Sequence, residues 1–119
     1  MTDTGKKVSV IKAKLSKPAQ HIISAQVLNE FSNIAYKKLG FPSQKIVSEI
    51  TAFQTVFMIV PLTTSCTLRA VAVKDRYGFS YYDSLIVATA LENQCSFLYS
   101  EDMQHGQVVD TLTIINPFI

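Results

Sequence analysis

The sequence is poor in several residue types, and each shortage excludes a class of site or protein. It has two cysteines, no tryptophan, and four residues each of glycine and proline among 119. Two thiols without CxxC or Cys/His spacing argue against a zinc site or a disulfide framework. The longest apolar run, VFMIV at 56–60, is far shorter than the roughly 20 residues of a membrane-spanning helix. Because the lysine-rich start also lacks the apolar core of a signal peptide, we expect a cytoplasmic protein.

Positive charge is missing from the second part of the chain, since no lysine or arginine follows Arg76. Residues 1–76 hold all 11 bases against four acids, a balance of +7, whereas residues 77–119 hold five acids and no base, a balance of −5. Scattered surface charge is the ordinary explanation. A cation site beside a surface that binds a polyanion would also produce this asymmetry.

The composition predicts a single globular domain over residues 1–119, since 48% of the residues are apolar and 17% are charged. Short apolar strands alternate with helices, which indicates an α/β three-layer α/β/α sandwich with a parallel sheet covered on both faces. The hydrophobic spacing and the Ser, Gly and Pro signals predict helices at 6–15, 25–40, 43–55, 63–77 and 82–95, and strands at 21–24, 56–60, 96–100 and 112–118.

Three acids fall where sites form in such sheets, beyond the carboxyl ends of the strands. Asp102 follows the strand at 96–100, Asp83 lies in the first turn of the helix at 82–95, and Glu30 lies early in the helix at 25–40. Each also has a structural explanation. Asp83 forms a capping box with Ser80, Ser100 can cap Asp102, and Glu30 can be a solvated helix residue.

If the three carboxylates converge, a cation must accompany them. Two carboxylates ~4 Å apart repel by ~4 kcal/mol at an effective dielectric constant near 20. Oxygen ligands without cysteine or histidine select Mg²⁺ or Mn²⁺, and a metal-activated water can attack a phosphodiester. His21 and His105 have no partner in the sequence that would make either a ligand or a base.

Three segments carry a resemblance to a known family: ISAQVLNEFSNIAYKKLG, SYYDSLIVATALENQCSFLYSEDMQHGQ and LTIINPF. Over residues 20–118 the chain resembles PIN-domain ribonucleases, of the toxin type found in bacterial toxin–antitoxin pairs of the VapBC kind. The resemblance implies an Mg²⁺- or Mn²⁺-dependent site that cleaves RNA, and an antitoxin partner. We also expect a homodimer. Matched by motif, Glu30, Asp83 and Asp102 are the second, third and fourth acids of that site, and Ser100 is the hydroxyl beside the last.

The start of the chain departs from the family, which opens with a central strand that ends in an aspartate. We find no such strand before the helix at 6–15, and Asp3 is a poor substitute for the first acid because it lies near a chain terminus. We therefore expect a weakly active nuclease. Either the chain is a truncated version of a longer protein, or another element or a second copy of the chain closes the gap in the sheet. The alternative is a catalytically inactive PIN module that binds RNA or an antitoxin-like protein. A receiver-like domain fits less well, because it would need a lysine after a late strand and no lysine follows Lys74.

Overall fold

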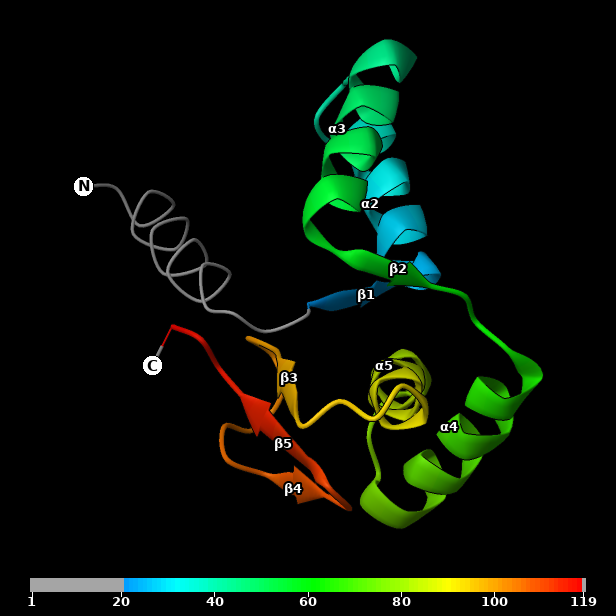
Figure 1. Ribbon diagram of the computed structural model, residues 1–119, viewed down its shortest axis with the longest axis vertical. Coiled ribbons are helices and arrows are strands. Elements are labelled where there is room, and N and C mark those ends of the chain that lie inside the picture. Colours follow the sequence, from blue (N-terminus) through cyan, green and yellow to red (C-terminus); the bar gives the residue numbers. More distant parts are fainter. Residues whose placement is uncertain (1–20, 119) are drawn as a thin grey trace. The chain divides into compact units, whose positions relative to one another are not determined.

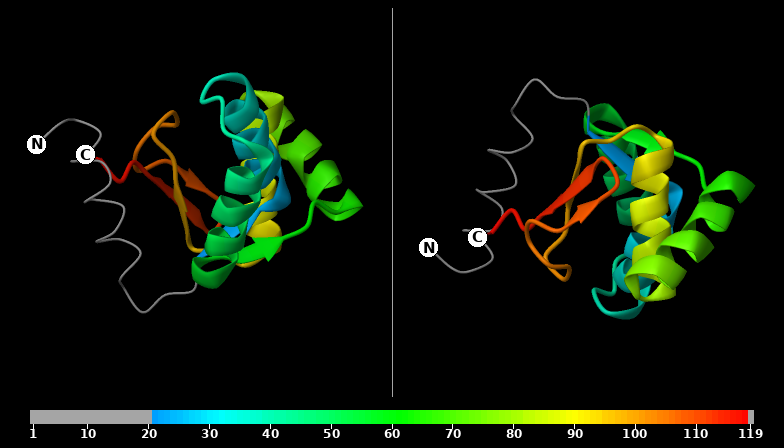
Figure 2. Two further views of the ribbon diagram at one scale, coloured as in Figure 1. Left: turned by 90° about the horizontal axis from the view of Figure 1, so that it is seen from above. Right: turned by 90° about the horizontal axis from the view of Figure 1, so that it is seen from below.

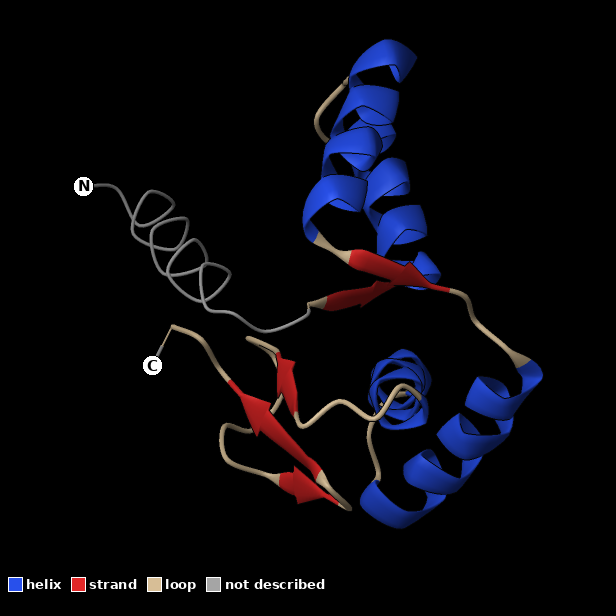
Figure 3. Ribbon diagram, viewed as in Figure 1, coloured by secondary structure: helices blue, strands red, loops and turns tan. Residues whose placement is uncertain are grey.

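A computed structural model describes residues 21–118, so the helix predicted at 6–15, the missing first strand and Asp3 lie outside the described residues. The described chain forms two compact units, which we call the first unit (residues 21–63) and the second unit (residues 64–118). Figure 1 labels their elements, and Figure 3 distinguishes helices from strands. Among the described residues no helix is long and apolar enough to cross a membrane.

The first unit is a pair of helices between two short parallel strands. Strand β1 (Ile22–Ser24) leads into helices α2 (Ala25–Lys37) and α3 (Ser43–Val56), and β2 (Met58–Val60) returns beside β1. The strands pair in parallel with Ile23 opposite Ile59. Helices α2 and α3 pack side by side through Phe31 and Phe53, whose ring centroids lie 5.3 Å apart in an edge-to-face contact.

The second unit places two helices beside a three-stranded sheet. It contains α4 (Thr64–Tyr77), α5 (Tyr81–Glu92), β3 (Phe97–Tyr99), β4 (Val108–Val109) and β5 (Leu112–Ile115). The strand order is β3-β5-β4, with β3 parallel and β4 antiparallel to β5. Helices α4 and α5 lie against each other in Figure 1 and in both views of Figure 2. The predicted parallel pairing is confirmed for β1–β2 and β3–β5, whereas β4 was not anticipated.

Helix α5 is the centre of the second unit, as its apolar residues on all sides predicted. One face gives Val87 and Leu91 to a buried cluster with Val109, Leu112 and Ile114 of the sheet. The opposite side gives Leu85 and Ala88 to a smaller cluster with Cys66 and Ala70 of α4. The helix begins three residues after Gly78, whose φ of +77° is a conformation that other residues rarely adopt. This packing fixes where the first turn of α5, and with it Asp83, lies in the unit.

Candidate metal centre

Asp83 is the third residue of α5 and is half-buried. Ser80 is the N-cap residue, and its hydroxyl oxygen accepts a hydrogen bond of 3.2 Å from the backbone N–H of Asp83. The predicted cap is therefore present. The cap fixes the backbone of the first turn of α5, from which the Asp83 side chain projects.

Asp102 lies in the loop that follows β3, and Ser100 shapes this loop. The Ser100 hydroxyl oxygen accepts hydrogen bonds of 3.3 Å from the backbone N–H groups of both Asp102 and Met103. Met103 is buried in the core of the second unit, whereas Asp102 is exposed. The buried Met103 side chain and the Ser100 hydroxyl thus hold the loop in place, while the Asp102 carboxylate is exposed to solvent. The Ser100 proton is still available to a ligand, because the hydroxyl uses only its lone pairs here.

Glu30 belongs to the first unit, on the exposed side of α2. Its Oε1 accepts a hydrogen bond of 2.9 Å from Nε2 of Gln26, one turn earlier in the helix. Gln26 itself is buried, so the pair ties Glu30 to a side chain that cannot move freely. Because Glu30 and the other two acids lie in different units, their convergence stays a prediction.

Asp83 and Asp102 of the second unit offer carboxylate oxygens, the type of ligand that a hard cation takes. In the described part of the chain no hydrogen bond or ion pair reaches the carboxylates of Asp83 or Asp102, whereas Glu92 is paired with Arg69. The described residues include no cluster of three or more Asp, Glu, His or Cys side chains that could hold a metal ion. Burial raises the pKa of the Cys95 thiol, which disfavours the thiolate form that binds metals.

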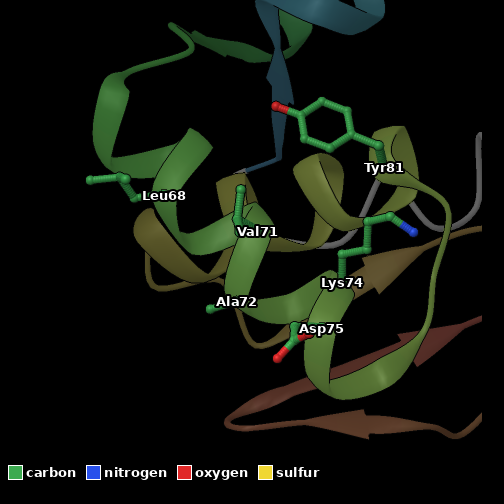
Figure 4. Close-up of a pocket in the computed structure, with 6 residues that line it drawn as sticks. All are labelled: Leu68, Val71, Ala72, Lys74, Asp75 and Tyr81. Carbon is green, nitrogen blue, oxygen red and sulfur yellow. The ribbon is translucent and has the colours of Figure 1, made fainter.

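A hollow of about 520 Å³ lies on α4 and the start of α5, lined by Leu68, Val71, Ala72, Lys74, Asp75 and Tyr81. Figure 4 shows its labelled side chains, of which Lys74 and Asp75 are the charged ones. None of the predicted acids lines it. The hollow is lined by both apolar and polar side chains, and it lies apart from the predicted site residues.

Two residues near the Asp102 loop, His105 and Asn116, form a hydrogen bond that the sequence did not predict. The backbone N–H of Asn116 donates a hydrogen bond of 3.0 Å to Nδ1 of His105. His105 therefore has a partner, which lies 11 positions later in the chain and contributes only a backbone group. No local spacing could have revealed this pair, because a backbone donor leaves no trace in the choice of side chain.

Comparison with known proteins agrees with the architecture. The sequence model of the PIN domain family matches residues 3–110, which span both units. One similar solved structure is a toxin–antitoxin complex from Klebsiella pneumoniae, with a TM-score of 0.64 and 20% sequence identity over 89% of this chain and 81% of the other. No curated protein matches the sequence. The predicted α/β fold of PIN type is confirmed, and at this identity the structural likeness concerns the fold alone.

Proposed function

From the membership of this chain in the PIN domain family, we propose that it is a cytoplasmic endoribonuclease of the VapC toxin type that depends on Mg²⁺ or Mn²⁺. PIN domains in general use divalent metal ions. In this chain Asp83, Asp102 and Glu30 would hold the ion, with Ser100 beside Asp102. When bound, the ion supplies a water activated for attack on a phosphodiester of RNA.

The observation that carries the proposal is the state of the two acids in the second unit. Ser80 accepts a hydrogen bond from the backbone N–H of Asp83, and Ser100 accepts one from the backbone N–H of Asp102. Neither carboxylate is paired with a base in the described chain. By contrast, Glu92 and Asp110 of the same unit both lie near Arg69. Two positioned, unpaired carboxylates are what a metal site needs before the metal arrives. The chain's own part is to hold these oxygens in place and to orient the RNA phosphate near them.

The decisive experiment compares Asp83→Asn with Glu92→Gln in an RNA cleavage assay with Mg²⁺ or Mn²⁺. Asparagine keeps the backbone N–H that Ser80 accepts from but is a poor ligand for these ions, so we expect cleavage to fall at least about 100-fold with little change in melting temperature. Glu92→Gln removes a carboxylate that is already paired, and we expect cleavage to persist. Cleavage that survives both chelator and Asp83→Asn would exclude a metal-dependent nuclease.

Metal binding offers a second measurement that does not require activity. An ion that relieves repulsion between carboxylates binds the folded state preferentially and stabilises it by RT ln(1 + [metal]/Kd), about 2.7 kcal/mol at a metal concentration 100 times Kd. We expect millimolar Mn²⁺ to raise the melting temperature of the wild type but not of Asp83→Asn. An equal shift in both proteins would place the bound ion elsewhere.

A second candidate function is protein binding, favoured by the apolar outer face of α4. Leu68 and Val71 of this helix are 68% and 57% exposed and line the hollow in Figure 4. Since a similar fold was solved in a toxin–antitoxin complex, we infer an antitoxin-like protein as the partner of this face. We also expect a homodimer, with a mass in light scattering of twice 13.2 kDa.

An antitoxin-like protein is the partner to test. We expect it to co-purify with the chain, to inhibit RNA cleavage, and to bind at least about tenfold more weakly to Leu68→Asp, because a charge in an apolar contact is left desolvated. Val47→Asp is the matched control on an exposed apolar residue of α3. Equal binding to both variants would exclude the α4 face as the docking surface.

A further inference from the structure

Two adjacent tyrosines at the start of α5 are exposed directly before Asp83. Tyr81 and Tyr82 are 38% and 63% exposed, and their ring centroids lie 5.5 Å apart in an edge-to-face contact. In the described part of the chain no hydrogen bond reaches the hydroxyl of either residue. The edge-to-face contact braces the two rings against each other and leaves most of Tyr82 open to solvent.

The connection that leads into these tyrosines is fixed by aromatic packing. The rings of Tyr77 and Phe79 stack with centroids 5.9 Å apart, and both residues pack against the core of the second unit. The Lys74 ammonium donates a hydrogen bond of 3.4 Å to the carbonyl of Phe79, and the Ser80 cap then starts α5. The tyrosine pair therefore extends from a backbone whose shape is set by the core.

Lys74 places a positive charge beside the tyrosine pair. It is exposed and lines the same hollow as Tyr81, and no carboxylate pairs with it in the described part of the chain. Its ammonium has three donors, of which the bond to Phe79 uses one. Figure 4 shows Lys74 extending toward the side of the hollow that holds Tyr81, whereas the Asp75 carboxylate points away from it. A free ammonium beside exposed aromatic rings suits a ligand that has both phosphates and flat bases.

We propose that Tyr82, braced by Tyr81, stacks on a base of single-stranded RNA while Lys74 binds a neighbouring phosphate. The inference rests on the proposed function for the identity of the ligand, since Asp83, the next residue, belongs to the proposed nuclease site. Every base has a flat face, so stacking on an aromatic ring holds a strand without selecting its sequence. The bases of a duplex already stack on one another, and single strands are therefore favoured.

A protein partner is the alternative occupant of these rings, and their positions separate the two. Tyr81 lines the hollow together with Leu68 and Val71, the residues proposed to contact an antitoxin-like protein, whereas Tyr82 does not line it. Tyr82 is thus the more exposed ring and lies outside the proposed protein contact. Its substitution therefore tests RNA binding without removing a residue of the hollow.

The test measures the binding of a fluorescently labelled, single-stranded oligoadenylate by anisotropy. All proteins are full chains that carry Asp83→Asn, and the buffer contains EDTA, so that the strand is not cut and no metal is required. We expect Tyr82→Leu to weaken binding at least about fivefold, the loss typical of removing one base–aromatic stack, and Tyr82→Phe to bind normally. Tyr36→Leu, which removes a 54% exposed tyrosine of the first unit, is the control and should also bind normally.

Two further measurements separate stacking from phosphate binding. An abasic strand of the same length keeps the phosphates but has no bases, so Tyr82→Leu should not weaken its binding. Each phosphate contact to a single strand contributes about 0.7 to the slope of log K against log salt concentration. We expect Lys74→Gln to reduce the slope for oligoadenylate by about this amount, whereas Tyr82→Leu should leave the slope unchanged.

The stacking role is overturned if Tyr82→Leu binds oligoadenylate as tightly as its parent, if Tyr36→Leu loses as much affinity, or if Tyr82→Leu loses equally on the abasic strand. An unchanged salt slope in Lys74→Gln would exclude the phosphate contact. If Tyr82→Leu binds RNA normally but loses the antitoxin-like protein, the tyrosine pair is a protein contact.

The result can be distinguished from the fate of the proposed function. If oligoadenylate binding depends on Tyr82 but the wild type cleaves no RNA with either metal, the nuclease activity is wrong and the chain is an RNA-binding module. If the wild type cleaves RNA in an Asp83-dependent manner while Tyr82→Leu changes neither binding nor cleavage, the stacking role alone is excluded.

Discussion

The two units differ in how they bury apolar side chains. The second unit contains both buried clusters of the described chain, and the larger joins α4, α5, the Met103 loop and the sheet. The first unit has few buried residues, and two of them, Ser24 and Gln26, are polar. Both units expose large apolar side chains, among them Ile34, Val47 and Met58 in the first unit and Leu68, Val71 and Phe97 in the second.

This difference in burial bears on the stability of the chain and on how firmly each proposed metal ligand is held. Burial of apolar surface is the main favourable term in folding, so the free energy of unfolding should depend chiefly on the second unit. That unit also holds Asp83 and Asp102 on elements packed against its core, whereas Glu30 lies on the exposed side of a helix in the unit with less core.

The largest expected effect comes from truncating the core of the second unit. Ile114→Ala removes a fully buried side chain of β5 from the larger cluster, and we expect a loss of about 2–5 kcal/mol in the free energy of unfolding. Ile46→Ala is the counterpart in the first unit, where Ile46 is buried but belongs to neither cluster. Its surroundings can relax, so we expect a smaller loss. Urea unfolding of both variants measures the two losses in the free energy of unfolding. Equal losses would show that the two units contribute equally to stability.

The sequence predicted the parts of this molecule that depend on neighbouring residues. The caps at Ser24 and Ser80, the apolar character of α5 on all sides and the parallel pairing of short strands are signalled within a few residues. Strand β4 was missed because it has two residues and exists only through its pairing with β5. The His105–Asn116 bond was missed for the same reason, since a contact between distant segments leaves no local pattern.

The same division applies to the site. Ser80 and Ser100 lie within three residues of the N–H groups that they accept from, so their roles as caps could be read from spacing alone and are confirmed. Whether Glu30 joins Asp83 and Asp102 depends on how residues about 50 and 70 positions apart come together. Spacing cannot fix that, and it stays a prediction that rests on the family resemblance.

The next largest effect is expected from removing the N-cap serine of α2 or of α5. Ser24→Ala and Ser80→Ala each remove a side-chain acceptor at a helix start, and we expect each to cost about 0.5–2 kcal/mol. Only Ser80 accepts from the N–H of a proposed ligand, so Ser80→Ala should also weaken Mn²⁺ binding, whereas Ser24 accepts from Val27. Calorimetry with Mn²⁺ distinguishes them. Ser80→Asn, which restores a capping acceptor, should recover both stability and affinity, and a failure of both would mean that the cap does not position Asp83.

The smallest expected effect concerns Arg69, which connects α4 to α5 and to the β4–β5 turn. Its guanidinium lies 3.2 Å from a Glu92 oxygen and 3.9 Å from an Asp110 oxygen, and all three side chains are partly exposed. Glu92 also accepts a hydrogen bond of 2.9 Å from the Ser65 hydroxyl, so it keeps one partner if Arg69 is removed. We therefore expect Arg69→Gln to lower the free energy of unfolding by less than about 1 kcal/mol.

Salt identifies the origin of that small loss. The Debye length falls from about 10 Å at 0.1 M to about 3 Å at 1 M salt, so the difference between wild type and Arg69→Gln should shrink over this range. Glu49→Gln is the control in the first unit, because no ion pair reaches Glu49 in the described part of the chain, and its small effect should not follow that trend. A loss above about 2 kcal/mol, or one that salt leaves unchanged, would show that the packing of the arginine stem matters more than its charge.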